Sequence, residues 1–346
     1  LIVRDANGCS DTTSTSVDVI DNPGASLTVS NDTFCYQTQK FVFDPSSSTG
    51  GYNQSLGRYT WKFSPDANPD TVTRTSPDKV SVKFDSAGIK TVKLYVENRK
   101  GCKDTLTKNI VVLPNPYASW VSGSYIQCLQ GNEFNFNSTN TQSTAGSSLV
   151  KYQWNFGTGA VPGTSTKITP NAVSYTGEGK KEVVLTVTDA NGCTDTFKHT
   201  VLVKPNPTAR FIFGTYGDNQ CFRGHTFEVD AQMAGSGQSS SPVGGSRILQ
   251  YYWDFGSGAN NQIDSGSNVK DITYSGFGKR NITLIIKDAN GCDDTLSKEI
   301  NVKNHPVAQF TINQASQCYR GNEFIFRNTG SSAVTNSSLT NYNWSF

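Results

Sequence analysis

The stretch Asp189-Ala-Asn-Gly-Cys-Thr-Asp-Thr196 decides the fold, because close counterparts of it recur along the chain. The other three begin at Asp5, Asn98 and Asp288, and each has an Asp-Thr pair shortly after its cysteine. The cysteines of the four turns are Cys9, Cys102, Cys193 and Cys292, at separations of 93, 91 and 99 residues. Because a period of this size is that of a whole domain, the sequence predicts one module repeated in tandem.

The Asn-Gly pair in these turns predicts a β-hairpin, because both residues tolerate the positive φ angles that a two-residue hairpin loop requires. Before Asn191-Gly192, apolar residues alternate at Val183, Leu185 and Val187, and a final strand is expected over 196–203. Alternation with one apolar face is the pattern of half-buried antiparallel strands. The last two strands of each module are therefore expected to form a long hairpin.

A tryptophan is expected in the core of each module. Each one is followed two positions later by a phenylalanine on the same strand face, as Trp154 is by Phe156. A platform for stacking on carbohydrate is the alternative, but a fixed place in every repeat favours the core. The tryptophans assigned to cores are Trp61, Trp154, Trp253 and Trp344. Together with short strands, turn chemistry and a lack of helix signals, they predict an all-β fold, with a sandwich of about seven strands per module.

Proline-containing joints mark the limits of the modules, since proline fixes its own backbone and restricts the residue before it. The joints are Asn22-Pro23, Pro114-Asn115-Pro116, Pro205-Asn206-Pro207 and His305-Pro306. They predict the end of one repeat over 1–22, module 1 over 23–113, module 2 over 114–205, module 3 over 206–303, and the front of a further repeat over 304–346. Because the sequence starts and stops within repeats, we expect it to be a stretch of a longer polypeptide.

Composition argues against several classes of function. Charge is balanced, with 30 Lys and Arg against 28 Asp and Glu, so neither nucleic acid nor an anionic membrane is an expected partner. Apolar runs are only a few residues long, and no membrane span is expected. The three histidines occupy unrelated positions, and hydrolase and phosphate-loop motifs are lacking. We expect neither catalysis nor a resident cofactor in these modules.

The residues around the tryptophans resemble those of the PKD (polycystic kidney disease) domain, an immunoglobulin-like module. Tyr252-Trp-Asp-Phe-Gly256 and Tyr152-Gln-Trp-Asn-Phe-Gly157 are similar to its Trp-Asp-Phe-Gly signature, whereas Trp61-Lys-Phe-Ser64 lacks the Asp and the Gly. The cysteine-containing turn resembles a variant abundant in large secreted proteins of Bacteroidota, including gliding-motility adhesins. The resemblance implies tandem immunoglobulin-like (PKD-type) β-sandwiches in an extended array at the bacterial cell surface.

The eight cysteines form two families. One family occupies the turns, and the other, which precedes the second strand of each module, comprises Cys35, Cys128, Cys221 and Cys318. An even number at recurring positions, without the spacing of metal ligands, favours disulfides and an oxidising, extracellular setting.

The immunoglobulin-like topology bears on how these cysteines pair. It puts the turn cysteine at the upstream end of a module and the other at the downstream end, so Cys35–Cys102 would have to span the domain, although a disulfide needs Cα atoms within about 7 Å. Pairing of neighbours, such as Cys102–Cys128, would require modules that fold back as a hairpin. In an extended rod, the downstream cysteine of one module instead lies beside the turn cysteine of the next module. We favour this scheme over the hairpin one. Its pairs are Cys35–Cys193 and Cys128–Cys292, with Cys9, Cys102, Cys221 and Cys318 paired to modules outside this stretch.

The aspartates that open three of the turns have two candidate roles. Asp5, Asp189 and Asp288 are candidate calcium ligands, but calcium requires six or more oxygens and each turn offers about two. Hydrogen bonding within the turn is the commoner role of such an aspartate, and Asn98 takes its place in one repeat. We therefore expect a turn-forming role.

Asp-Ser/Thr-apolar triplets resemble the O-glycosylation sites of secreted Bacteroidota proteins. The alternative is that these Thr residues simply favour strands. The candidate sites are Thr71, Ser86, Thr105 and Thr295.

Taken together, these features predict a structural stalk or filament segment of a giant bacterial cell-surface adhesin, which provides reach, stiffness and adhesive surface. The adhesive contacts are assigned to variable Ser-, Asn- and Gly-rich loops over 44–57, 137–149, 231–247 and 327–340. Expected partners are neighbouring repeats and surface polysaccharide or other cells. Two alternatives stay open: the spacer of a secreted hydrolase, and the subunit of a laterally assembled extracellular filament.

Overall fold

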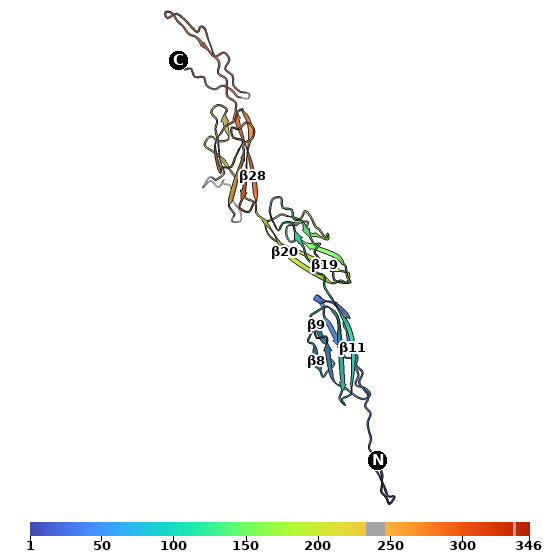
Figure 1. Cartoon of the computed structure of the whole chain (residues 1–346). Helices are drawn as coiled ribbons and strands as arrows, with labels where there is room; N and C mark the ends of the chain where they lie inside the picture. The colour runs from blue at the N-terminus through green and yellow to red at the C-terminus, as the bar shows by residue number, and fades with distance from the viewer. Residues whose placement is uncertain (233–245, 335–336) are drawn as a thin grey trace.

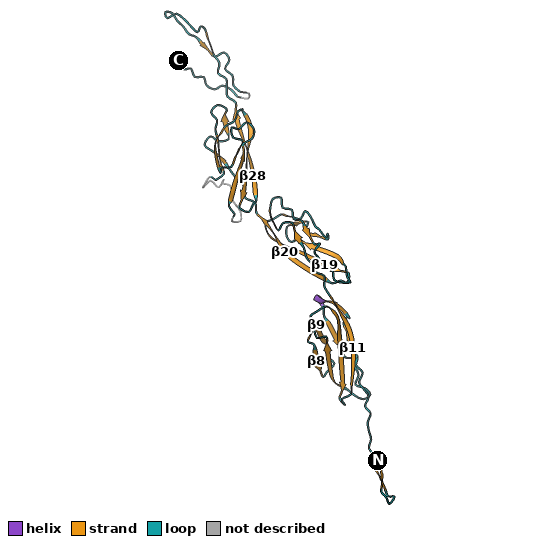
Figure 2. Ribbon diagram, in the orientation of Figure 1, coloured by secondary structure: helices purple, strands orange, loops and turns teal. Residues whose placement is uncertain are grey.

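The computed structural model describes residues 1–232, 246–334 and 337–346. Three β-sandwiches follow one another along an extended rod, and the two termini lie at its opposite ends (Figure 1). The described residues contain strands and loops and no α-helix, with one short 3-10 helix, η1, at Tyr36–Thr38 (Figure 2). The all-β class and the tandem immunoglobulin-like architecture are therefore confirmed.

Module 1 consists of a four-stranded and a five-stranded sheet. Its strands are β3 (Thr28–Val29), β4 (Thr33–Cys35), β5 (Phe41–Asp44), β6 (Leu56–Phe63), β7 (Ala67–Asn68), β8 (Thr71–Arg74), β9 (Val80–Phe84), β10 (Gly88–Asn98) and β11 (Lys103–Leu113). The strand orders are β3-β5-β9-β7 and β4-β11-β10-β6-β8.

Module 2 repeats the five-stranded sheet and has a more broken opposite layer. Its strands are β12 (Val121–Ser122), β13 (Ile126–Cys128), β14 (Phe136–Asn137), β15 (Leu149–Asn155), β16 (Ala160–Val161), β17 (Thr164–Ser165), β18 (Ser174–Tyr175), β19 (Gly179–Asp189) and β20 (Thr194–Lys204). The large sheet has the order β13-β20-β19-β15-β17, and β12-β14 and β16-β18 are two-stranded.

Module 3 has the same plan. Its strands are β21 (Ile212–Phe213), β22 (Asn219–Cys221), β23 (Phe227–Asp230), β24 (Ile248–Asp254), β25 (Ile263–Asp264), β26 (Asn268–Ile272), β27 (Gly278–Asp288) and β28 (Asp293–Lys303). Its sheets have the orders β22-β28-β27-β24-β25 and β21-β23-β26. Short hairpins stand at the two ends of the chain, formed by β1 (Ile2–Arg4) with β2 (Ser10–Thr12) and by β29 (Thr311–Ile312) with β30 (Phe326–Arg327).

The long hairpin of each module puts the two cysteine families at opposite ends of the sandwich. In module 2, β19 and β20 pair over their whole length, from Gly179 opposite Val203 to Thr188 opposite Thr194. Strand β13 runs parallel to β20, with Cys128 beside Lys204. Because Cys193 immediately precedes β20, it lies at the upstream end, and Cys128 lies at the downstream end.

Each sandwich encloses its own hydrophobic core. Trp61, Trp154 and Trp253 are 0%, 2% and 0% exposed. The indole Nε1 of Trp154 donates to the carbonyl of Lys167 at 2.8 Å, and that of Trp253 donates to the carbonyl of Gly266 at 2.7 Å. A buried indole N–H usually has such a partner, so these two tryptophans are both packed and hydrogen-bonded.

Two tryptophans, Trp344 and Trp120, differ from the expectation of one core tryptophan per repeat. Trp344 was assigned to a core but is 43% exposed, with its ring against Phe310, Phe326 and Phe346. The reason is that the described residues of 304–346 contain no counterpart of the long β10–β11 hairpin that covers Trp61. Module 2, moreover, has a second core tryptophan: Trp120 is 2% exposed and lies 6.1 Å from Trp154 between ring centroids.

The Asp and the Gly of the Trp-Asp-Phe-Gly stretch form one local turn. The backbone N–H of Gly256 donates to Asp254 Oδ1 at 2.8 Å, and that of Gly157 donates to Asn155 Oδ1 at 2.9 Å. Gly157 has φ +80°, and a Cβ there would lie 2.9 Å from the carbonyl oxygen of Glu182, so a side chain does not fit. Module 1 lacks this turn, and its strand β6 continues to Phe63.

At alkaline pH, modules 2 and 3 are expected to lose stability before module 1. Burial raises the pKa of Tyr175 from the usual 10.0 to about 12, and the pKa of Tyr274 is also raised to about 12, with burial as the largest cause. The hydroxyls of Tyr175 and Tyr274 donate hydrogen bonds to the carbonyls of Phe156 and Phe255, respectively. The stability from the neutral hydroxyls is complete below pH 10 and is lost as the pH rises through about 12.

Module 1 has Phe84 at the equivalent position and serves as the comparison there. Burial also raises the pKa of Tyr59 in module 1, but Tyr59 lies on β6, so the Tyr175→Phe variant is the control for this position. Hydrogen-exchange mass spectrometry between pH 9 and 12, corrected for the intrinsic exchange rate, is expected to show earlier loss of protection in β19 and β27 than in β10. Equal loss in all three strands would contradict this expectation, and Tyr175→Phe is expected to remove the difference for module 2.

Candidate functional site: the joints between modules

The four cysteine-containing turns, of which the one at 98–102 has Lys100-Gly101 in place of Asn-Gly, are held by the first residue of each turn. Asp189 Oδ1 accepts hydrogen bonds from the backbone N–H groups of Asn191 at 3.0 Å and Cys193 at 2.8 Å. The other turns have the same pair of bonds, to Asp5, Asn98 and Asp288. Gly192 has φ +81°, a value that glycine adopts without strain. The turn thus holds Cys193 in a fixed position at the upstream end of module 2.

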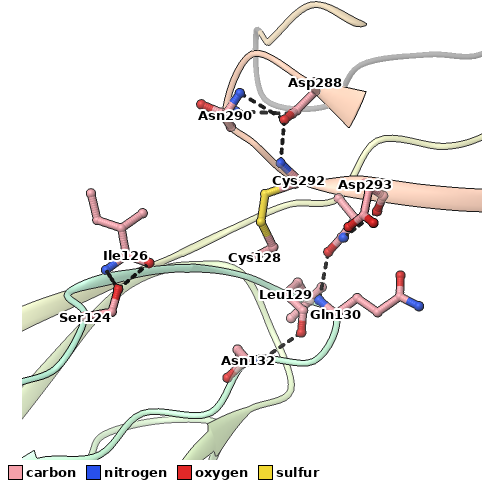
Figure 3. The surroundings of a disulfide bond; sticks show 11 residues. Ser124, Ile126, Cys128, Leu129, Gln130, Asn132, Asp288, Asn290, Cys292 and Asp293 are labelled. Carbon is pink, nitrogen blue, oxygen red and sulfur yellow. Dashed lines mark hydrogen bonds between the residues drawn. A yellow bond between two sulfur atoms is a disulfide. The ribbon is translucent and has the colours of Figure 1, made fainter. Parts of the chain in front are cut away.

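Disulfides join two of the four turns, those of modules 2 and 3, to the preceding module. Cys35 of module 1 bonds to Cys193 of module 2, and Cys128 of module 2 bonds to Cys292 of module 3. Both pairs have Cα atoms 5.5 Å apart. Figure 3 shows the second bridge, which passes from the green ribbon at Cys128 to the orange turn at Cys292. These are the pairs that the extended-rod scheme predicts, and we refer to them as cross-joint disulfides.

A single asparagine adds hydrogen bonds across each bridged joint. Asn115 Oδ1 accepts from the backbone N–H of Gln37 in module 1 at 2.9 Å, and its Nδ2 donates to the carbonyl of Thr194 in module 2 at 2.6 Å. Asn206 does the same with Gln130 at 2.7 Å and Asp293 at 2.7 Å. Because both halves of the amide are used, the residue between the two prolines fixes the orientation of both neighbours. The sequence pattern alone did not predict this role.

The Asp-Thr aspartates fasten the first segment of each module to its last strand. Asp195 Oδ2 accepts from the N–H of Ala118 at 2.8 Å, and its Oδ1 accepts from Gln37 Nε2 of the preceding module at 3.2 Å. In module 1 the equivalent bond runs from Ala25 to Asp104 at 2.7 Å. The pKa of the Asp104 carboxyl lies below its usual value. The hydrogen bond from the N–H of Ala25 is the largest cause and that from the N–H of Thr105 is the next, because both bonds favour the carboxylate.

The joint before residues 304–346 differs from the two bridged joints. His305 occupies the position of Asn115 and Asn206, and its ring stacks on Phe222 with centroids 6.1 Å apart. Cys221, the downstream cysteine of module 3, is exposed and unbridged. Cys9, Cys102 and Cys318 are also unbridged in this chain. Their pairing with further modules stays a prediction.

The turn aspartates have the turn-forming role expected of them. Their Oδ1 atoms are occupied by backbone N–H groups, and Asp288 Oδ2 additionally lies 3.4 Å from Asn290 Nδ2. Over residues 1–232, 246–334 and 337–346, no group of three or more His, Cys, Asp or Glu side chains is placed to hold a metal ion. Nothing in these contacts assigns calcium to the turns.

The variable loops and the glycosylation candidates differ in how much of them the structure describes. Loop 44–57 is tied to the start of module 1 by a two-way backbone pair between Gly24 and Thr49, at 2.8 and 2.9 Å. Most of loop 231–247 lies outside the described residues, as do two residues of loop 327–340. All four candidate glycosylation residues are exposed, and Ser86 Oγ donates to Asp66 Oδ2 at 2.6 Å. Their modification stays a prediction.

Two sheets closed over a tryptophan-centred core, repeated along a rod, define tandem immunoglobulin-like β-sandwich modules. A family model described as PKD domain matches residues 115–204, which is module 2 almost end to end. No helix in the part of the chain that the structure describes is both long and apolar enough to cross a membrane.

Known proteins give further similarities. Pre-pro-metalloprotease PrtV of Vibrio cholerae serotype O1 is 40% identical over 80 residues, which are 22% of this chain and 8% of PrtV. The crystal structure of the PKD1 domain of the same metalloprotease is 32% identical over 26% of this chain and 98% of that domain, with a TM-score of 0.21. A Ca²⁺-stabilised, ice-binding adhesin of an Antarctic bacterium is 11% identical, covers 88% of this chain and 80% of its own, and has a TM-score of 0.33.

Proposed function

We propose that this chain is a stretch of the stalk of a giant cell-surface adhesin, of the gliding-motility type found in Bacteroidota. Its role is reach and stiffness. The supporting observation is that both bridged joints combine a disulfide with an asparagine bonded to both neighbouring modules. Disulfides at recurring positions suit an oxidising environment, so we place the protein outside the cell.

Adhesion is assigned to the variable loops rather than to the joints. Surface loops on a rigid scaffold tolerate changes in length and sequence and commonly carry binding function. Their Ser-, Asn- and Gly-rich composition offers hydrogen-bonding groups suited to polysaccharide or to the surfaces of other cells. Sugars on Thr71, Ser86, Thr105 and Thr295 would increase solubility and protease resistance, and mass spectra of peptides from native material test this modification.

The stalk function predicts an extended shape in solution. An 11-residue strand such as β20 spans about 36 Å at about 3.3 Å per residue, so three modules in line exceed about 100 Å. Small-angle scattering of the oxidised chain is expected to give a maximum dimension above about 100 Å. Modules folded back on one another would instead give a markedly shorter dimension, which would contradict the proposal.

The same sample allows a check of connectivity. Non-reducing peptide mapping is expected to recover peptides joined through Cys35–Cys193 and Cys128–Cys292. Recovery of a Cys102–Cys128 peptide would support the hairpin arrangement and contradict the stalk.

A second candidate is the spacer of a secreted hydrolase, which is favoured by the similarity to the metalloprotease PrtV. The matched stretch is only 8% of that protein, so the modules would serve as one of its parts. The complete sequence of the polypeptide separates the two candidates. Many more repeats favour the adhesin, and a hydrolase motif favours the spacer.

A further inference from the structure

We infer that the cross-joint disulfides confine tension to two segments of each module and keep the rest of the module out of the line of force. The inference rests on the proposed stalk function, in which the chain is pulled along its axis. It follows from where the bridges attach, and module 2, which has a bridge at each end, is the complete example.

Two covalent connections enter module 2 and two leave it. The backbone enters at Pro116, and the bridge from Cys35 enters at Cys193, just before β20. At the downstream end, the segment 116–128 continues through the bridge from Cys128 to module 3, and β20 continues through the backbone at Pro205. Both connections therefore cross the module along its length.

The two tension-carrying segments also hold each other. At the downstream end, β13 and β20 pair in parallel from Ile126 opposite Leu202 to Cys128 opposite Lys204. At the upstream end, the N–H of Ala118 donates to Asp195 Oδ2 at 2.8 Å. Tension that enters one segment is therefore shared with the other before it reaches the next joint.

Residues 129–192, which contain Trp154, β15 and β19, lie between Cys128 and Cys193, and the bridges attach these two cysteines to modules 3 and 1. A fully extended residue spans at most about 3.6 Å, so the segment 116–128 cannot exceed about 45 Å, which is close to the length of about 36 Å that β20 spans across the same module. Without bridges, the backbone over about 90 residues would lengthen to about 320 Å on unfolding. The bridges thus make a module nearly inextensible.

In this chain the bridges also protect the flanking modules. Between the two bridges run three parallel connections, over residues 35–128, 128–193 and 193–292, and each contains the body of one folded module. The distance between the bridges increases only if all three modules unfold. If one bridge is removed, one flanking module is left as the sole connection in its part of the chain.

Force spectroscopy on the whole chain, held by its two termini, tests this inference. The reduced chain is expected to lengthen in three steps of about 300 Å, one for each module. The oxidised chain is expected to show no such step over the same range of force. Steps of about 300 Å in the oxidised chain at the forces seen after reduction would overturn the inference.

Double variants sharpen the test. Cys35→Ser with Cys193→Ser leaves the Cys128–Cys292 bridge and is expected to expose module 1 alone, giving one step. Cys128→Ser with Cys292→Ser is expected to expose module 3 alone. Two or more steps from either oxidised double variant would also overturn the inference. Cys221→Ser, which removes an unbridged cysteine, is the matched control and is expected to leave the oxidised trace without steps.

A core substitution identifies the module that gives the step. In the Cys35→Ser, Cys193→Ser background, Trp61→Ala is expected to lower the force of the single step, and Trp253→Ala is expected to leave it unchanged. The reverse pattern would contradict the assigned path of tension. Scattering separates this result from the stalk function, because an extended chain that still shows steps refutes only the inference, whereas a compact chain refutes the stalk.

Discussion

Replacing Trp154 with alanine is expected to lower the free energy of unfolding of module 2 by about 3–5 kcal/mol, the range for removing a large aromatic side chain from a core. Trp154 is 2% exposed, and its ring lies 5.8 Å from Phe136 and 5.7 Å from Phe156 between centroids. The substitution also leaves the carbonyl of Lys167 without its indole donor. Both effects destabilise the same sandwich.

Denaturant-dependent hydrogen exchange on β19 measures this change within module 2 alone. Trp344→Ala is the matched control, because Trp344 is 43% exposed and its loss is expected to leave the three complete modules unchanged. If Trp154 instead served as a platform for a ligand, its removal would abolish binding while stability stayed close to that of the parent. That result would overturn the assignment of Trp154 to the core.

The repeated turns predicted most of the fold, because their chemistry is local. The alternation before and after the turn determines which face is buried, so the long hairpin could be derived from adjacent residues. The loop itself has three residues instead of the expected two, because the N–H of Asp189 donates to the carbonyl of Cys193 at 2.9 Å, and only Gly192 has positive φ. The pairing of Cys35 with Cys193 also follows from a simple geometric argument, since parallel first and last strands put the two cysteine families at opposite ends of a module.

The asparagine of the joint was not predicted, because its partners are distant in sequence. Asn115 contacts Gln37, 78 residues earlier, and Thr194, 79 residues later, and both contacts are to backbone groups that any residue type would supply. The recurrence of asparagine at positions 22, 115 and 206 was the one available signal. Trp120 was not predicted for a different reason. It lies two residues after Ala118, and the equivalent position is occupied by Leu27 in module 1 and by Phe211 in module 3. The position therefore recurs, but the residue type varies.

Removing the cross-joint disulfides is expected to destabilise module 2 more than modules 1 and 3. When module 2 unfolds between folded neighbours, each bridge closes its chain into a loop of about 80 residues, which restricts the unfolded state. Loop closure of this size is worth about 4 kcal/mol in the chain-entropy account, and measured disulfides typically contribute about 2–4 kcal/mol. Modules 1 and 3 each have one such constraint, whereas module 2 has two.

We therefore expect Cys128→Ser with Cys292→Ser to lower the stability of module 2 by about 2–4 kcal/mol, and reduction of both bridges to lower it further. Exchange protection of β19 relative to β10 reports this difference within one molecule. Cys221→Ser is expected to change stability by no more than about 0.5 kcal/mol, as for a surface substitution that removes no contact. If reduction weakened all three modules equally, the bridges would act mainly on the orientation of folded modules, and the restriction of the unfolded chain would contribute little.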